Sequence, residues 1–332
     1  PPPDTEVGGE RPTVQLVDVK KTKDGYEFGF DRLDRWIDMC KRCGIKYFEM
    51  SHLFTQWGAE HAPKIIAEVD GEEKRIFGWE TDADSAEYCD FLRRFAAALT
   101  AFIDKKGIRN FCRFHVSDEP SLEQYETYKK RGDILAGIFP GFKVIDALSD
   151  IEFFDKGAVK YPIPSEDHVE DFVGKVDEIW TYYCCGQHNK DVPNRFFAMP
   201  SARNRILGAL LYKYNAVGFL QWGYNFWYSQ FSKHEIDPFT VTDAGKAFPS
   251  GDAFVVYPGE NGQPLNSLRL KVFYDGLQDF AAMRLLESLV GREKALEIIV
   301  RDDEFSFLKY PHGSSYLIAL RERVNQAIKE NI

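Results

Sequence analysis

Hydrophobic and polar residues follow one another along this chain in patterns that predict strands and helices in turn. The helical spacing of Phe30, Leu33, Ile37 and Cys40 predicts a helix over 30–43, and Gly44 is placed to end it. Strand-forming residues predict strands at 14–19 and 45–50 on either side of that helix. The same patterns predict later helices over 85–106, 122–137, 202–214, 267–289 and 292–332, and strands at 111–116, 142–147, 179–184, 217–222 and 253–257.

One segment interrupts this succession. Residues 51–82 follow an early strand and contain two strand-like runs, 64–69 and 74–77, on either side of Asp70-Gly71. Asp-Gly between two such runs is a strong local signal for a β-hairpin. We therefore expect a β-hairpin insertion after an early strand.

Alternating strands and helices imply parallel strands joined by crossover helices. A closed barrel fits 332 residues better than a doubly wound sheet, and no G-x-G-x-x-G follows an early strand. We predict an α/β fold, a (β/α)8 TIM-type barrel that occupies residues 13–332 and includes the C-terminal helices. Residues 1–12, which begin Pro-Pro-Pro-Asp, are interpreted as the linker remnant of a trimmed N-terminal region.

Charge and cysteine content exclude several kinds of partner. A formal net charge of −10, with no basic face, argues against nucleic-acid binding, and no apolar stretch is long enough to cross a bilayer. A lone C-x-x-C, Cys40 to Cys43, is no zinc site without further ligands, and no nucleotide or metal motif appears, so no cofactor is expected. Free thiols slightly favour the cytoplasm, while a trimmed start leaves a secreted or periplasmic location open.

The sharpest candidate for chemistry is an acidic pair. In a barrel, reactive groups lie at the carboxyl ends of strands, and the strand ending near Val116 leads directly into Asp118 and Glu119 before Pro120. A single acid before proline would also serve as a helix cap. Two adjacent acids repel, which raises the pKa of one of them, as a general acid at neutral pH requires. His115 is expected to hydrogen-bond behind the pair.

Adjacency restricts the mechanism. Ordinary glycosidases place two carboxyl groups on opposite sides of the scissile bond, at least ~5 Å apart. Neighbouring acids suit substrate-assisted hydrolysis, in which Glu119 protonates the leaving oxygen and then activates water, while Asp118 holds the substrate's 2-acetamido group. One alternative is a glycosidase of another sugar that pairs Glu119 with a distant carboxylate, Glu49 or Asp146. Another is a carbohydrate-binding barrel without activity.

Other strand ends supply side chains for a sugar site. Aromatic residues make up 15% of the chain, and pyranose C–H faces stack on aromatic rings. The densest aromatic run is 221–228, and as a group these rings favour a carbohydrate platform. The predicted substrate-binding residues are His52, Trp57, Tyr182, Tyr183, Trp222, Asn225 and Trp227.

At these residues the chain resembles glycoside hydrolase family 123 and proteins with the DUF4091 domain. The resemblance rests on segments 57–64, 115–120, 221–227, 251–259, 267–270 and 275–279. It implies a (β/α)8 barrel and a retaining, substrate-assisted β-N-acetylgalactosaminidase, acting on a glycan or glycolipid. It also implies that Glu119 is the acid/base and Asp118 the residue that orients the acetamido group. Members commonly carry an N-terminal β-sandwich domain, and its absence here agrees with the trimmed start.

Overall fold

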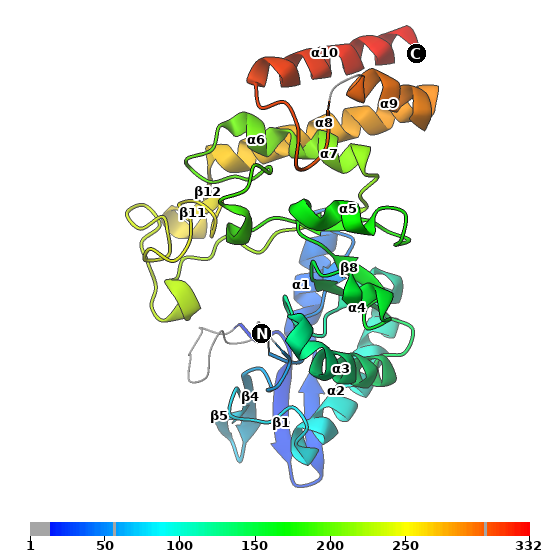
Figure 1. Ribbon diagram of the computed structural model, residues 1–332. Helices are drawn as coiled ribbons and strands as arrows, with labels where there is room; N and C mark the ends of the chain where they lie inside the picture. Colours follow the sequence, from blue (N-terminus) through cyan, green and yellow to red (C-terminus); the bar gives the residue numbers. More distant parts are fainter. Residues whose placement is uncertain (1–13, 56–57, 302–303) are drawn as a thin grey trace. The chain divides into compact units, whose positions relative to one another are not determined.

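The computed structural model describes residues 14–55, 58–301 and 304–332 (Figure 1). Its contacts divide the chain into two compact units. Unit 1 comprises the described residues up to Pro162 together with 231–233, and unit 2 comprises 163–230 and the described residues from 234 onward. Short 3₁₀ turns lie at Arg109–Phe111, Leu122–Gln124, Glu166–His168, Cys185–Gln187, Gln230–Ser232 and Glu260–Gly262.

The first sheet of unit 1 joins two hairpins in the order β2-β1-β4-β5. The expected hairpin is confirmed, with β4 (Ile65–Val69) antiparallel to β5 (Glu72–Phe77). A second hairpin, β1 (Asp18–Thr22) with β2 (Gly25–Gly29), was not predicted. Its turn residues are Lys23 and Asp24, and Gly25 begins β2 with a φ of 136°, so an Asp-Gly signal was present here too. The predicted strand 14–19 coincides with β1 only at its last two residues.

The second sheet has the order β3-β6-β7-β8 and carries the helices of unit 1. β6 (Cys112–Phe114) lies parallel to β3 (Phe48–Glu49) and to β7 (Lys143–Ala147). The short strand β8 (Tyr161–Ile163) was missed, because a central proline is atypical of strands away from a sheet edge. The helices are α1 (Asp31–Arg42), α2 (Ala86–Lys106), α3 (Tyr125–Ile138) and α4 (Glu152–Asp155).

Helix α2 shows why these residues fold as predicted. The Ser85 side chain accepts from the backbone N–H of Tyr88, and Gly107 ends the helix with a φ of 66°. Tyr88 and Phe91 on its inner face pack against Phe77 of β5, with ring centroids 5.1 and 5.2 Å away. Helix α3 lies beside α2 (Figure 1). The aromatic supply of the chain thus goes in part into the core of unit 1.

Unit 2 pairs β9 (Trp180–Tyr182) in parallel with β10 (Gly218–Leu220), and helices α6 and α7 connect them along the chain. The predicted helix 202–214 is divided at Ile206 into these two helices. At Gly208, a Cβ would lie 1.8 Å from the carbonyl oxygen of Gly276, so glycine permits a close crossing with α8. The other elements are α5 (Val169–Phe172), α6 (Ser201–Arg205), α7 (Leu207–Lys213), β11 (Val256–Pro258), β12 (Pro264–Asn266) and α8 (Leu268–Val290).

Residues 292–332 do not form the one helical stretch expected there. They form two helices, α9 (Arg292–Val300) and α10 (Ser314–Glu330). Pro311-His312-Gly313 precedes α10, and a proline followed by glycine is a helix-breaking signal. Figure 1 shows α10 beside α8 and α9, with which it packs.

Parallel pairing and strand–helix alternation confirm the expected α/β class with parallel sheets. The closed (β/α)8 barrel over 13–332 stays a prediction, and the linker interpretation of 1–12 falls outside the described residues. All six cysteines are free. Within the part of the chain described, no helix is long and apolar enough to cross a membrane.

Candidate active site

The acidic pair lies where strand β6 ends. β6 finishes at Phe114, and His115 to Glu119 continue the chain beyond it. β3 and β7 flank β6 in parallel, so their carboxyl ends lie at the same edge of the sheet. This edge brings Glu49 from β3 and Asp146 from β7 to the segment that bears the acids. The sequence argument from strand ends therefore selected residues that share one edge.

Backbone hydrogen bonds hold this segment in place. Asp146 Oδ1 accepts from the N–H groups of Val116 and Ser117, at 3.0 and 3.3 Å. The Ser117 hydroxyl donates to the carbonyl of Thr55 at 3.1 Å, and the Glu119 N–H donates to the carbonyl of Ala147 at 2.9 Å. Glu119 itself has a φ of 43°, a left-handed conformation that costs a non-glycine residue of order 1 kcal/mol. Such strained residues cluster at functional sites.

The two acids have different surroundings. Glu119 is exposed, whereas Asp118 is partly buried. Burial, and then repulsion by Glu119, raises the pKa of Asp118 to about 7, against an opposing effect of His115. Near neutral pH the pair therefore gains or loses a proton readily, as a site of acid–base chemistry requires.

The imidazole of His115 lies between the carboxylates of Glu49 and Asp146. It is 2% exposed, with Nε2 2.9 Å from Glu49 Oε1 and Nδ1 3.5 Å from Asp146 Oδ1. Burial alone would lower the pKa of His115, but Asp146 and Glu49 raise it to about 10. Burial, and then the charge of His115, lowers the pKa of His52 to about 3, and the two imidazole rings lie 4.9 Å apart. At neutral pH these shifts favour a protonated His115 and a neutral His52.

Asp146 is a buried anchor. It is fully buried, and Tyr128 of α3 donates its hydroxyl to Oδ2 at 2.5 Å. With two backbone N–H groups, a phenol and an imidazole around it, this carboxylate has no open face for a sugar carbon. The geometry therefore argues against Asp146 as the distant nucleophile considered above. Glu49 keeps 48% of its side chain exposed and stays open to substrate.

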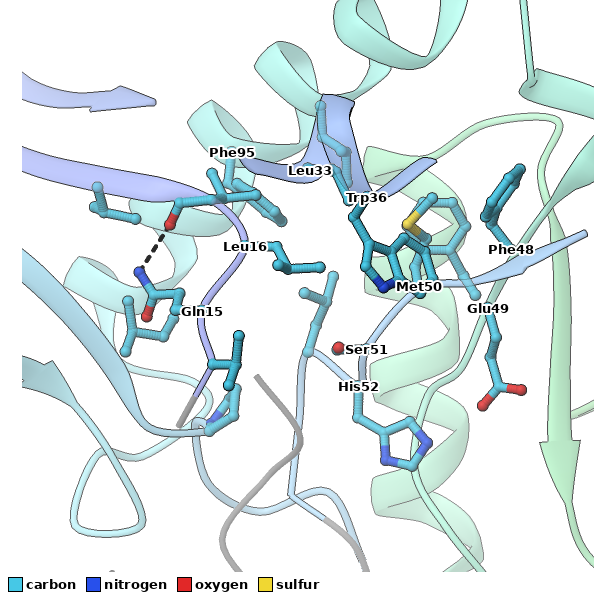
Figure 2. A pocket seen from close by; sticks show the side chains of 18 of the residues that line it. Gln15, Leu16, Leu33, Trp36, Phe48, Glu49, Met50, Ser51, His52 and Phe95 are labelled. Carbon is cyan, nitrogen blue, oxygen red and sulfur yellow. Dashed lines mark hydrogen bonds between the residues drawn. The ribbon is translucent and has the colours of Figure 1, made fainter. Parts of the chain in front are cut away.

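Unit 1 also contains an apolar cavity of about 450 Å³. Figure 2 shows Leu16, Leu33, Trp36 and Phe95 around it, with Glu49 and His52 at one side. Neither Asp118 nor Glu119 belongs to the described lining of this cavity. A sugar needs several hydrogen-bonding partners, and this lining supplies few. We therefore assign the acidic pair, rather than this cavity, to the candidate active site.

The predicted aromatic residues of unit 2 differ in accessibility. Trp222 is 41% exposed, and its Nε1 donates to Asp252 Oδ2 at 3.2 Å. Trp227 is partly buried and donates to the carbonyl of Val256 at 3.1 Å. The ring of Trp222 is therefore accessible, and its hydrogen bond to Asp252 fixes its orientation.

Strand β9 ends with Tyr182 of the predicted pair, and Tyr183 follows it directly. Tyr182 is 8% exposed, and Tyr183 is fully buried with its ring 4.9 Å from that of Phe219. With both ring faces covered, Tyr183 stacks within the core of unit 2, and any contact with substrate would fall to its hydroxyl. Asn225 is exposed, and Trp57 lies outside the described residues.

Sequence reasoning missed the buried polar residues that support these groups. Asp252 is fully buried, and burial raises its pKa to about 6. Arg195, 4% exposed, donates to the carbonyls of Gly223 and Asp252. Tyr128, beneath Asp146, was likewise not singled out. Its only sequence signal was a tyrosine on the inner face of an expected helix, which is ordinary core material.

Carboxyl groups at the strand ends of an α/β fold are the acid–base groups that glycoside hydrolases commonly use. The chain matches the family model for the glycoside hydrolase 123 catalytic domain over residues 2–286. The protein therefore belongs to glycoside hydrolase family 123, which confirms the resemblance found from sequence motifs.

Among solved structures, the chain is similar to a family 123 glycoside hydrolase from Clostridium perfringens, whose structural analysis concerned glycolipid glycan hydrolysis. The match has a TM-score of 0.66 at 17% sequence identity, and it covers 95% of this chain and 58% of that one. At this identity the likeness is one of fold, and the chain spans little more than half the length of its relative. A search of curated proteins finds no match.

Proposed function

We propose that this protein is a retaining glycosidase that removes a terminal β-linked N-acetylgalactosamine, with the substrate's 2-acetamido group as nucleophile. The observation that carries the proposal is the contrast between two sequence neighbours, an exposed Glu119 and a partly buried Asp118 beside a cationic His115. Neighbouring residues on one segment are poorly placed to flank a glycosidic bond from opposite sides. They are well placed to act on two adjacent groups of one sugar.

In the first step, Glu119 donates its proton to the leaving oxygen as the C1–O bond breaks. The acetamido oxygen attacks C1 and forms an oxazolinium ion, and the Asp118 carboxylate accepts the N–H hydrogen bond and stabilises the positive charge. In the second step, Glu119 removes a proton from water, which attacks C1 and opens the ring. Two inversions at C1 give net retention.

The proposed substrate-binding residues divide between polar and aromatic groups. Trp222 would stack on the sugar, since its ring is accessible and held by Asp252. His52, as a neutral imidazole, would exchange hydrogen bonds with hydroxyl groups. Trp57, Tyr182, Tyr183, Asn225 and Trp227 complete the proposed set. We propose that the sugar is carried by a glycolipid or a free glycan. The structural analysis of the Clostridium perfringens relative concerned glycolipid glycan hydrolysis, which supports this proposal.

The decisive experiment measures a panel of aryl N-acetylhexosaminides and plain hexosides, with product stereochemistry followed by NMR. We expect turnover of the β-N-acetylgalactosaminide with retention and inhibition by a thiazoline analogue of the oxazoline. Glu119→Gln should abolish turnover of natural glycosides while leaving binding largely intact, and Asp118→Asn should be nearly as damaging. Glu123→Gln, in the first turn after the pair, is the matched control. Near wild-type rates in either active-site variant would refute the mechanism.

One alternative keeps a specific observation in its favour. Glu49 is ionised beside His115 and half-exposed, so it could be the nucleophile for a sugar without an acetamido group. In that case Glu49→Ala would lose turnover of plain hexosides, and azide would restore it as a glycosyl azide. A carbohydrate-binding protein without activity would bind the sugar and turn over no aryl glycoside.

A further inference from the structure

Strand β3 holds Glu49 at the sheet edge that carries the acidic pair. Successive side chains of a strand point to opposite faces, so Phe48 is buried at 2% exposure while the Glu49 side chain is 48% exposed. Figure 2 shows Phe48 and the Glu49 carboxylate on opposite sides of the chain. The Met50 N–H donates to the carbonyl of Arg113 at 2.8 Å, which fixes the backbone beside β6. The Glu49 carboxylate therefore has a defined position and an accessible side.

The contact between Glu49 and His115 leaves this carboxylate with acceptor capacity. Glu49 Oε1 lies 2.9 Å from His115 Nε2. Within the described part of the chain that nitrogen has no hydrogen-bond partner, so the contact is one of charge and not a formed hydrogen bond. A carboxylate offers about four acceptor positions. Those on the exposed side of Glu49 can accept from a ligand.

The other carboxyl groups at this edge are already engaged. Asp146 is fully buried, and its oxygens accept from two backbone N–H groups and a phenol hydroxyl. In the proposed mechanism Asp118 accepts the acetamido N–H, and Glu119 exchanges a proton with the leaving oxygen and then with water. A terminal N-acetylgalactosamine still presents hydroxyl groups at C3, C4 and C6, and Glu49 is placed to accept from one of them.

We propose that Glu49 accepts a hydrogen bond from one hydroxyl group of the terminal sugar and is a specificity-determining residue of this site. The inference rests on the proposed function, in which the acetamido group is the nucleophile and Glu49 only binds. A hydrogen bond to a charged group changes affinity by about 10- to 100-fold. An enclosed polar site can reject the analogue without the hydroxyl by about 10⁴-fold. At 48% exposure water can replace the missing hydroxyl, so the smaller factor applies.

The test is a double-mutant cycle between enzyme and substrate. We would measure kcat/KM for an aryl β-N-acetylgalactosaminide and its 3-, 4- and 6-deoxy analogues, with the wild type and Glu49→Ala. Removal of the contacted hydroxyl should cost the wild type about 10- to 100-fold and Glu49→Ala less than about threefold. The other two analogues should lose equally with both enzymes. Equal losses for all three analogues would overturn the proposal.

Two further variants complete this cycle. Glu49→Gln keeps the shape and one acceptor oxygen without the charge, so its selectivity should lie between those of the wild type and Glu49→Ala. Glu73→Ala, at an exposed carboxylate of β5, is the control and should give the wild-type ratio for every analogue.

Azide separates a binding role of Glu49 from a nucleophilic one. Azide can replace a missing carboxylate nucleophile, but it cannot replace an acceptor that holds a hydroxyl group. We therefore expect azide to leave the activity of Glu49→Ala unchanged. A glycosyl azide product would overturn the proposal.

A second measurement needs neither turnover nor a variant. In the wild type with ¹³C-labelled glutamate carboxyl groups, N-acetylgalactosamine should shift the Glu49 signal. One of the three deoxy sugars should bind about 10- to 100-fold more weakly and leave that signal in place. A Glu49 signal that ignores bound sugar would overturn the proposal. Binding with this shift but without turnover of any N-acetylhexosaminide would refute the proposed function alone.

Discussion

Tyr128→Phe tests the buried anchor by removing one atom. Tyr128 is fully buried, and its hydroxyl donates to Asp146 Oδ2 at 2.5 Å while its ring packs edge-on against Phe153 at 5.3 Å. Phenylalanine keeps the ring contact and removes only the donor. A hydrogen bond to a charged group contributes about 1.5–3 kcal/mol. Oδ2 keeps the Val116 N–H at 3.2 Å, so we expect a loss of about 2 kcal/mol, which is roughly a thirtyfold change in an opening equilibrium.

The assay must report on unit 1 rather than on the whole chain, because two compact units need not unfold together. Hydrogen exchange of peptides that contain Val116 and Ser117 reports opening of the segment that Asp146 holds. Tyr125→Phe is the matched control, since Tyr125 starts the same helix and donates to the exposed carbonyl of Lys156 at 3.2 Å. We expect less than about 0.5 kcal/mol there. Equal protection in the two variants would refute the view that Tyr128 stabilises Asp146.

Three further predictions concern other parts of the chain. Gly208→Ala should destabilise unit 2 by more than about 3 kcal/mol in thermal unfolding, because its Cβ would meet the Gly276 carbonyl at 1.8 Å. Asp279→Asn should cost about 2 kcal/mol in urea, because Asp279 is 4% exposed and accepts twice from Arg205, at 2.7 and 3.1 Å. Asp118→Asn should stabilise by up to about 4 kcal/mol at pH 8 and by nothing near pH 4. The folded pKa of about 7 lies above the ordinary 3.8, so the cost of the carboxylate appears as pH rises between these values.

Controls for these variants come from matched sites. Gly137→Ala, in helix α3, meets nothing within 4 Å and should be neutral or slightly stabilising. Asp133→Asn removes an exposed pair with Lys129 and should cost less than about 0.5 kcal/mol. If Gly208→Ala is tolerated like Gly137→Ala, the close crossing of α7 and α8 is wrong. A stability gain in Asp118→Asn that does not depend on pH would contradict the cause given for its raised pKa.

The fold could be predicted from the sequence wherever one local signal decided the element. Ser85 and Gly107 bound α2 as expected, and Asp70-Gly71 marked the hairpin of β4 and β5. The prediction was wrong or incomplete where a local signal was weak or where one element was predicted over too long a range. Strand β8 has three residues and a central proline, and the expected helix 292–332 contained its own helix breaker. The turn at Lys23-Asp24 was overlooked, since residues 18–23 contain three lysines and little hydrophobic alternation.

In the candidate site too, some residues could be identified from the sequence and others only from the structure. Asp118 and Glu119 could be selected because position after a strand is a local property. The role of Asp146 could not, because a carboxylate at the end of a strand is a plausible nucleophile until its neighbours are known. Those neighbours come from elsewhere: Tyr128 lies on the preceding helix, and the backbone N–H groups belong to the adjacent strand's continuation. The burial of Asp146 and the number of donors around its carboxylate show that it is an anchor rather than a nucleophile. Both properties depend on tertiary packing.

The structure gives a physical reason why two neighbouring acids differ. Two carboxylates on adjacent residues repel each other, and identical surroundings would leave the shared proton divided between them. Here the first acid lies partly buried at the strand end, near the imidazolium, while the second turns to solvent through a φ of 43°. Burial and repulsion by Glu119 raise the pKa of Asp118 against the opposing effect of His115, whereas Glu119 is exposed to solvent. In the proposed mechanism the partly buried Asp118 accepts the acetamido N–H hydrogen bond, and the exposed Glu119 is the proton donor.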